Sequence, residues 1–123
     1  DDGKQVLRKM ASADVIVMAT PLYFFAASAP LKMVMDRMFS LYKWDNAAGT
    51  MQTPLKGKTL VVLASAFEDV GLDALEKPFA LTASYTGMNF RSLLIPNAGV
   101  SGDIIKQPGI REKAVSLGRE VAG

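Results

Sequence analysis

The sequence contains the apolar run Val15-Ile16-Val17-Met18-Ala19, which carries no charge and is followed by Thr20-Pro21. A short, continuous apolar run rich in β-branched residues is typical of a strand that is buried on both faces of a parallel sheet. Proline has no N–H to donate to a neighbouring strand, so the strand is expected to end at Thr20-Pro21. The run therefore predicts a buried strand over residues 15–19.

Two more apolar runs, at residues 59–66 and 90–95, are predicted to be strands. Amphipathic helices are predicted around the three runs. The first has its cap at Asp2, and the others start near Pro30, Pro78 and Pro108, because proline is favoured in the first turn of a helix. Between the second helix and the second strand, the polar residues 43–58 are predicted to form a long connection.

The last predicted helix has an apolar side that is expected to face the sheet, formed by Ile110, Ala114, Leu117 and Val121. Apolar strands that alternate with amphipathic helices predict an α/β fold, in which a doubly wound parallel sheet is covered by helices on both faces. The length of 123 residues fits one domain over residues 1–123.

The composition excludes several kinds of site. The chain has no histidine, which rules out a Ser-His-Asp or Cys-His catalytic set within it, and no cysteine, which rules out disulfides and thiolate metal sites. Absence of cysteine suits a cytoplasmic protein. The net charge is +2 and the basic residues are scattered, so neither nucleic acid nor a membrane is expected as a partner. No metal site is predicted.

Ligands of open parallel sheets bind beyond the carboxyl ends of the strands, which selects residues 20–27, 65–72 and 96–102. The first of these loops carries Tyr23, Phe24 and Phe25, and exposed rings at a strand end suit a flat apolar ligand such as an isoalloxazine or a nicotinamide. An alternative is that Tyr23 and Phe24 turn inward and cover the core. The adjacent carboxylates Glu68 and Asp69 are interpreted as a solvated turn, and no catalytic residue is predicted.

A longer motif surrounds the first strand. It reads Ala13-Asp14-Val15-Ile16-Val17-Met18-Ala19-Thr20-Pro21-Leu22-Tyr23-Phe24 and continues, after a gap, as Ser28-Ala29-Pro30-Leu31-Lys32-Met33-Val34-Met35-Asp36-Arg37. This pattern resembles a signature of the NADPH-dependent FMN reductase and iron–sulfur flavoprotein group, which is flavodoxin-like. Later segments are similar to the same group: Leu55-Lys56-Gly57-Lys58, Thr86-Gly87-Met88 and the run from Leu117 to Ala122.

The resemblance implies a flavodoxin-like sheet that holds FMN and uses NAD(P)H as reductant. The implied chemistry is hydride transfer through flavin N5 to a small-molecule electron acceptor, and the implied assembly is a homodimer or homotetramer. The cofactor-binding residues implied along the ribityl chain and ring are Thr20, Pro21, Leu22, Tyr23 and Phe24. Those implied near the polar edge of the ring are Ser65, Ala66 and Phe67.

The chain also departs from the group's pattern. Members begin with a strand and a polar loop that wraps the FMN phosphate, and this sequence opens at the helix before the third strand. Residues 15–19 are therefore expected to form an edge strand. Loss of three charge-assisted hydrogen bonds to the phosphate would weaken FMN binding at least about a thousandfold. This chain alone is therefore expected to bind FMN weakly or not at all.

Two other functions stay open at this point. One is a non-enzymatic flavodoxin-type electron carrier, although such carriers are typically strongly acidic and this chain has a net charge of +2. The other is an interaction fragment that binds no cofactor. A phospho-receiver domain is set aside, because it needs an aspartate at the end of the third strand, where this chain has Thr20-Pro21.

Overall fold

A three-stranded parallel sheet forms the centre of the computed structural model, which describes residues 1–123. Its strands are β1 (Val15–Pro21), β4 (Thr59–Ser65) and β5 (Asn89–Ile95), in the spatial order β1-β4-β5. The register aligns Pro21 with Ser65 and Ser65 with Ile95, so the carboxyl ends of the three strands are level. The predicted strands and the edge position of the first one are confirmed.

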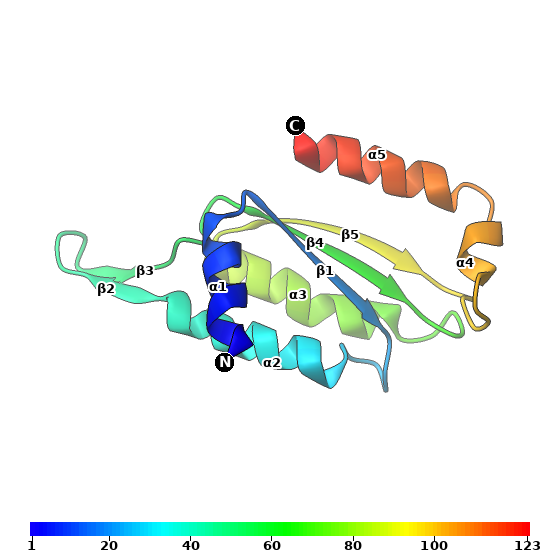
Figure 1. The fold of residues 1–123 in the computed structure, drawn as a ribbon, viewed down its shortest axis with the longest axis horizontal. Coiled ribbons are helices and arrows are strands. Elements are labelled where there is room, and N and C mark those ends of the chain that lie inside the picture. Colours follow the sequence, from blue (N-terminus) through cyan, green and yellow to red (C-terminus); the bar gives the residue numbers. More distant parts are fainter.

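Helices lie on both faces of the sheet (Figure 1). On one face are α1 (Asp2–Ser12), α2 (Ala29–Arg37) with its 3-10 continuation η1 (Met38–Leu41), and α3 (Leu72–Thr86). On the opposite face lies α5 (Ile110–Ala122), which follows the short helix α4 (Asp103–Lys106). This arrangement confirms the predicted α/β class. No helix combines the length and the apolar character needed to cross a membrane.

The hydrophobic core lies between the sheet and the three helices α1, α2 and α3. Its largest fully buried side chains are Leu55, Leu60, Val62, Leu75 and Phe79. The opposite face is covered less completely, because Val17 in the middle of β1 is 55% exposed and α5 has no buried residue. The predicted inner side of α5 is therefore wrong in part: Ala114 is exposed, and the other three residues are only half-buried.

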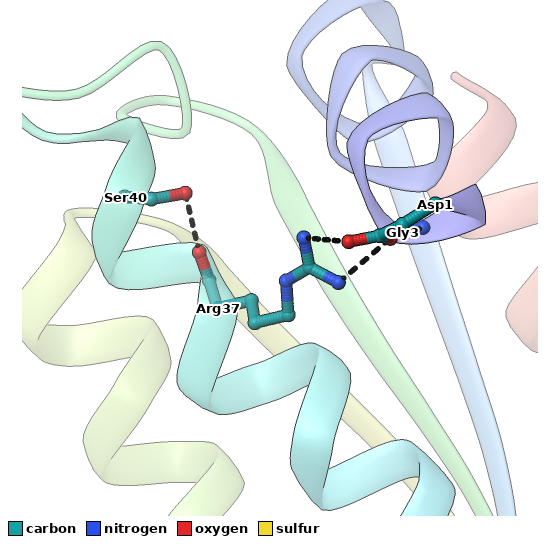
Figure 2. Close-up of polar contacts among 4 residues, drawn as sticks. All are labelled: Asp1, Gly3, Arg37 and Ser40. Carbon is teal, nitrogen blue, oxygen red and sulfur yellow. Dashed lines mark hydrogen bonds and ion pairs between the residues drawn. The ribbon is translucent and has the colours of Figure 1, made fainter.

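The first helix is capped by Asp1 rather than by the predicted Asp2. The Asp1 carboxylate accepts a hydrogen bond of 2.6 Å from the Gly3 N–H. It also accepts two bonds of 3.0 Å from the Arg37 guanidinium, which projects from α2 (Figure 2). The Ser40 hydroxyl in turn donates to the Arg37 carbonyl at 2.7 Å. One carboxylate thus satisfies one of the free N–H groups of α1 and joins that helix to α2.

The structure corrects two predictions, one about a connection and one about the start of a helix. Residues 43–58 are not only a connection, because they contain an antiparallel hairpin of β2 (Lys43–Asp45) and β3 (Thr50–Gln52). Strands of three residues are too short to show an alternating pattern, and the turn is held by Asp45, whose carboxylate accepts from the N–H groups of Ala47 and Ala48. Helix α3 starts at Leu72, six residues before Pro78, which lies inside the helix.

Candidate functional site

Three loops meet at the level carboxyl ends of the sheet. Hydrogen bonds between strands continue into them: the Leu22 N–H donates to the Ser65 carbonyl at 2.8 Å, and the Ala66 N–H donates to the Ile95 carbonyl at 2.9 Å. The Ala98 N–H then donates to the Ala66 carbonyl at 2.9 Å. The loops after β1, β4 and β5 are therefore tied to one another by backbone bonds at the place where ligands of such sheets bind.

Thr20 shapes the loop that leaves β1. Its side chain is buried, and its hydroxyl donates to the Pro21 carbonyl at 2.8 Å while accepting from the Ser28 N–H at 3.0 Å. The hydroxyl thereby closes the loop of residues 20–28 onto the start of α2. With its proton committed to Pro21, this group is placed to fix the loop rather than to donate to a ligand.

The aromatic rings of this loop point away from the core. Tyr23 is 62% exposed and Phe24 is 98% exposed, whereas Leu22 packs against the core. The alternative in which Tyr23 and Phe24 cover the core is therefore wrong. Tyr23 and Ala26 exchange two backbone hydrogen bonds of 3.0 and 3.1 Å, and the two residues between them form a tight turn.

Two pockets open beside these loops. The first has a volume of about 330 Å³ and lies at the strand ends, where it is lined by Ala19, Thr20, Pro21, Leu63, Ala64, Ser65, Ile95 and Ile104. The second has a volume of about 240 Å³ and is lined by Leu22, Phe24, Phe25, Ala66, Phe67, Glu68 and Val70. Seven of the eight predicted cofactor-binding residues line one or the other, and Tyr23 lies outside both linings.

The loops offer stacking surfaces and backbone donors. Phe67 is 72% exposed, as Phe24 is, and no hydrogen bond in the structure engages the backbone N–H of either residue. Ser65 and Ala66 are small, and Ala66 is buried, so the strand end does not obstruct a ligand. These features fit a flat ring with a polar edge, because the rings supply apolar contact and the free N–H groups supply hydrogen bonds.

The same loops do not offer charge for a phosphate. Residues 20–27, 65–72 and 96–102 contain no lysine and no arginine, and their only ionisable groups besides Tyr23 are Glu68 and Asp69. Two carboxylates repel an anion, so these loops suit an uncharged flat ring and not a phosphate group.

Some lining residues were not predicted from the sequence. Phe25 is the third ring of the aromatic run, and Ile104 comes from α4, a helix of four residues that has no periodic pattern to reveal it. The Gln107 side chain holds α4 in place by donating to the Pro96 carbonyl at 2.8 Å and to the Asn97 carbonyl at 3.1 Å. The sequence feature that could have indicated the turn before α4 is Asp103, whose carboxylate accepts a hydrogen bond from the Val100 N–H at 3.1 Å.

A larger pocket lies away from the strand ends. Its volume is about 500 Å³, and it is bounded by the end of α2, by η1 and by the last turns of α3, with Phe39, Tyr42 and Tyr85 in its lining. The Tyr42 hydroxyl donates to the Tyr85 carbonyl at 3.3 Å, and the two rings are in edge-on contact. Partial burial raises the pKa of Tyr42, and Coulombic repulsion from Tyr85 adds to the rise.

Known proteins share this fold and parts of this sequence. An iron–sulfur flavoprotein of Methanocaldococcus jannaschii is 51% identical over 37 residues, which are 30% of this chain and 19% of that protein. A Bacillus subtilis protein named as an NAD(P)H-dependent FMN-containing oxidoreductase is 22% identical over 108 residues. That match covers 86% of this chain and 59% of the relative, so the chain spans less than two thirds of either relative.

The solved structures agree in fold. The FMN-dependent NADH-azoreductase of Bacillus anthracis, solved in complex with FMN, superposes with a TM-score of 0.75 at 15% identity. The match covers 98% of this chain and 62% of the azoreductase. Residues 1–118 also match the sequence profile of a protein family described as having the flavodoxin-like fold. With its parallel sheet, its helices on both faces and this match over nearly its whole length, the chain belongs to the flavodoxin-like fold family.

Proposed function

We propose that this chain forms the ring-binding part of an FMN site in an NAD(P)H-dependent oxidoreductase that reduces a small-molecule acceptor. The observation that carries the proposal is the pair of exposed rings, Tyr23 and Phe24, at the level carboxyl ends of a parallel sheet. The names of the Bacillus subtilis relative and of the Bacillus anthracis azoreductase support FMN and a reduced nicotinamide as the reagents.

Each loop has a role in this proposal. Tyr23 and Phe24 would supply the aromatic surface for the isoalloxazine. Thr20, Pro21 and Leu22 would hold the turn that presents them, and Ser65 and Ala66 would leave room at the strand end. The free N–H of Phe67 would donate to the polar edge of the ring. The chemistry that FMN supplies when bound is two-electron transfer from the nicotinamide to an acceptor through flavin N5. Binding and orienting the ring requires no titratable side chain, which agrees with the absence of histidine and cysteine.

The proposal separates the ring from the phosphate. Because residues 20–27, 65–72 and 96–102 carry no cation, the binding energy in these loops comes from stacking and from backbone hydrogen bonds. The expected homodimer or homotetramer and the cytoplasmic location stay predictions.

The proposal is tested by NAD(P)H oxidation with the chain, FMN at a concentration below its dissociation constant and a soluble benzoquinone as acceptor. Tyr23→Ala and Phe24→Ala should each lower flavin binding and the rate of NAD(P)H oxidation by about tenfold, because each removes one stacking surface. Tyr85→Ala is the matched control, since Tyr85 is 75% exposed but lies far from the strand ends. The proposal fails if the control loses as much as the two variants, or if the wild-type chain binds no flavin. A flavin-bound chain that does not oxidise NAD(P)H would instead identify an electron carrier.

A further inference from the structure

Two aromatic rings lie directly on glycine backbone in the loops beyond the strand ends. The ring of Phe25, from the loop after β1, covers Gly71 in the loop after β4, so closely that a Cβ at Gly71 would overlap it. The ring of Phe67, from the loop after β4, covers Gly99 in the loop after β5. A Cβ at Gly99 would lie 2.6 Å from Phe67 Cε2 and 2.7 Å from Cδ2, which is closer than real side chains allow.

These contacts explain how a strained turn persists. Phe24 and Phe25 have φ angles of 43° and 66°, a left-handed conformation that is unfavourable for bulky side chains. Strain of this kind survives only where surrounding contacts enforce it. The ring of Phe24 is almost fully exposed and can enforce nothing, whereas Phe25 is about half covered, with Gly71 against its ring. Phe25 is therefore the residue that holds the turn.

The two contacts join the three loops in sequence. Phe25 links the loop after β1 to the loop after β4, and Phe67 links the loop after β4 to the loop after β5. The backbone bonds from Leu22 to Ser65 and from Ala98 to Ala66 run between the same loops. Any movement of one loop would therefore disturb its neighbour.

We propose that Phe25 on Gly71 and Phe67 on Gly99 are positioning contacts that hold the three loops in their ligand-binding arrangement before any ligand is present. The inference rests on the proposed function for the identity of the ligand, a flavin ring. The exposed ring of Phe24 is presented to the ligand because the neighbouring ring of Phe25 is anchored. Glycine is required at positions 71 and 99 because any side chain there displaces an anchoring ring.

The first test needs no ligand. It measures amide hydrogen exchange by NMR at Tyr23 and Ala26, which are hydrogen-bonded to each other, and at Ala98, which is bonded to Ala66. Phe25→Ala and Gly71→Ala should each speed exchange at Tyr23 and Ala26 by at least about tenfold. Gly99→Ala should do the same at Ala98. Phe25→Tyr retains the ring, so its amide exchange rates should equal those of the wild type.

The matched control is Gly57→Ala. Gly57 has a φ of +84°, close to the +87° of Gly71, but an added Cβ at Gly57 would meet no atom within 4 Å. This variant therefore introduces the same backbone strain without displacing a ring. When Gly71→Ala is added to the Phe25→Ala variant, the free energy of unfolding should fall by no more than it falls when Gly57→Ala is made in the wild-type chain. The proposal is refuted if Gly71→Ala and Gly57→Ala change the amide exchange rates of Tyr23 and Ala26 equally. It is also refuted if Phe25→Ala leaves those two amides protected.

The second test uses riboflavin as the probe. Phe25→Ala and Gly71→Ala should weaken riboflavin binding by at least about fivefold and should reduce the maximal quenching of its fluorescence. Failure of the wild-type chain to bind riboflavin would contradict the proposed function, and the exchange experiment would still decide the positioning contacts. Unchanged riboflavin affinity in both variants, with a wild-type chain that binds, would overturn the inference alone.

Discussion

At the scale of single residues, Thr20 shows how a buried polar group can organise a candidate site. Its hydroxyl donates to one backbone carbonyl and accepts from one backbone N–H, so a residue eight positions away is fixed against the end of β1. The bridge closes the loop that carries the exposed rings of Tyr23 and Phe24. The side chain that organises the site is thus distinct from the side chains offered to a ligand.

Replacing Thr20 by valine should lower the free energy of unfolding by about 1–3 kcal/mol, because the Ser28 N–H loses its acceptor in a partly buried place. Urea unfolding measures the change. Thr20→Ser keeps the hydroxyl and should lose less. A larger loss for Ser than for Val would mean that the methyl group, and not the hydrogen bond, stabilises the loop.

Tyr42 gives a prediction about pH. The pKa of Tyr42 is raised in the folded protein above its ordinary value of 10.0, mainly by burial and then by repulsion from Tyr85. A raised pKa in the folded state means that the stabilising contribution is complete below the unfolded pKa and is lost as the pH rises through the folded pKa. Urea midpoints measured between about pH 8 and about pH 11 should fall less steeply for Tyr42→Phe than for the wild type. Parallel curves would contradict this assignment.

At the scale of elements, helix α3 shows where sequence patterns are insufficient. Proline is favoured in the first turn of a helix, and so Pro78 indicated a start. The true start at Leu72 depends on Leu72, Leu75 and Phe79, which are buried against the sheet, and tertiary burial outweighs the cost of a proline within the helix. Gly71, the residue before the helix, has a positive φ that no sequence period reveals.

Pro78 should be a source of instability. A proline at this position deprives the Ala74 carbonyl of its helical partner, at a cost of up to about 3 kcal/mol. Pro78→Ala should therefore raise the free energy of unfolding by about 1 kcal/mol or more. Pro54→Ala, in a turn outside any helix, is the control and should bring no gain. A loss of stability in Pro78→Ala would show that the packing of α3 depends on the proline.

The three sheet strands were predictable because their apolar runs are long and are separated by helical patterns. The hairpin at residues 43–52 was not, since each of its strands has three residues. At the candidate site, the sequence identified the aromatic loop and the small residues after β4 through the rule that ligands bind at carboxyl strand ends. It did not reveal Phe25 on Gly71 or Phe67 on Gly99, because contacts between loops depend on backbone angles and on packing over long sequence distances.

At the scale of the whole molecule, the fold is asymmetric. Three helices bury one face of the sheet, whereas the opposite face leaves Val17 exposed and has only α5 above it. β1 forms one edge of this three-stranded sheet. The strand ends provide a surface for a flat ring, and the three loops there provide no cation. These features support the proposal that the strand ends hold the planar ring of a flavin.

The central claim is that a flavin ring lies on the aromatic turn after β1. The most direct measurement is an NMR titration of the isotopically labelled chain with riboflavin and, separately, with FMN. We expect the amide signals of Tyr23, Phe24 and Phe67 to shift with both ligands, with dissociation constants that agree within about threefold and are weaker than about 1 µM. Shifts confined to the pocket of Phe39 and Tyr85, or FMN affinity tighter than about 1 µM with riboflavin much weaker, would contradict the claim.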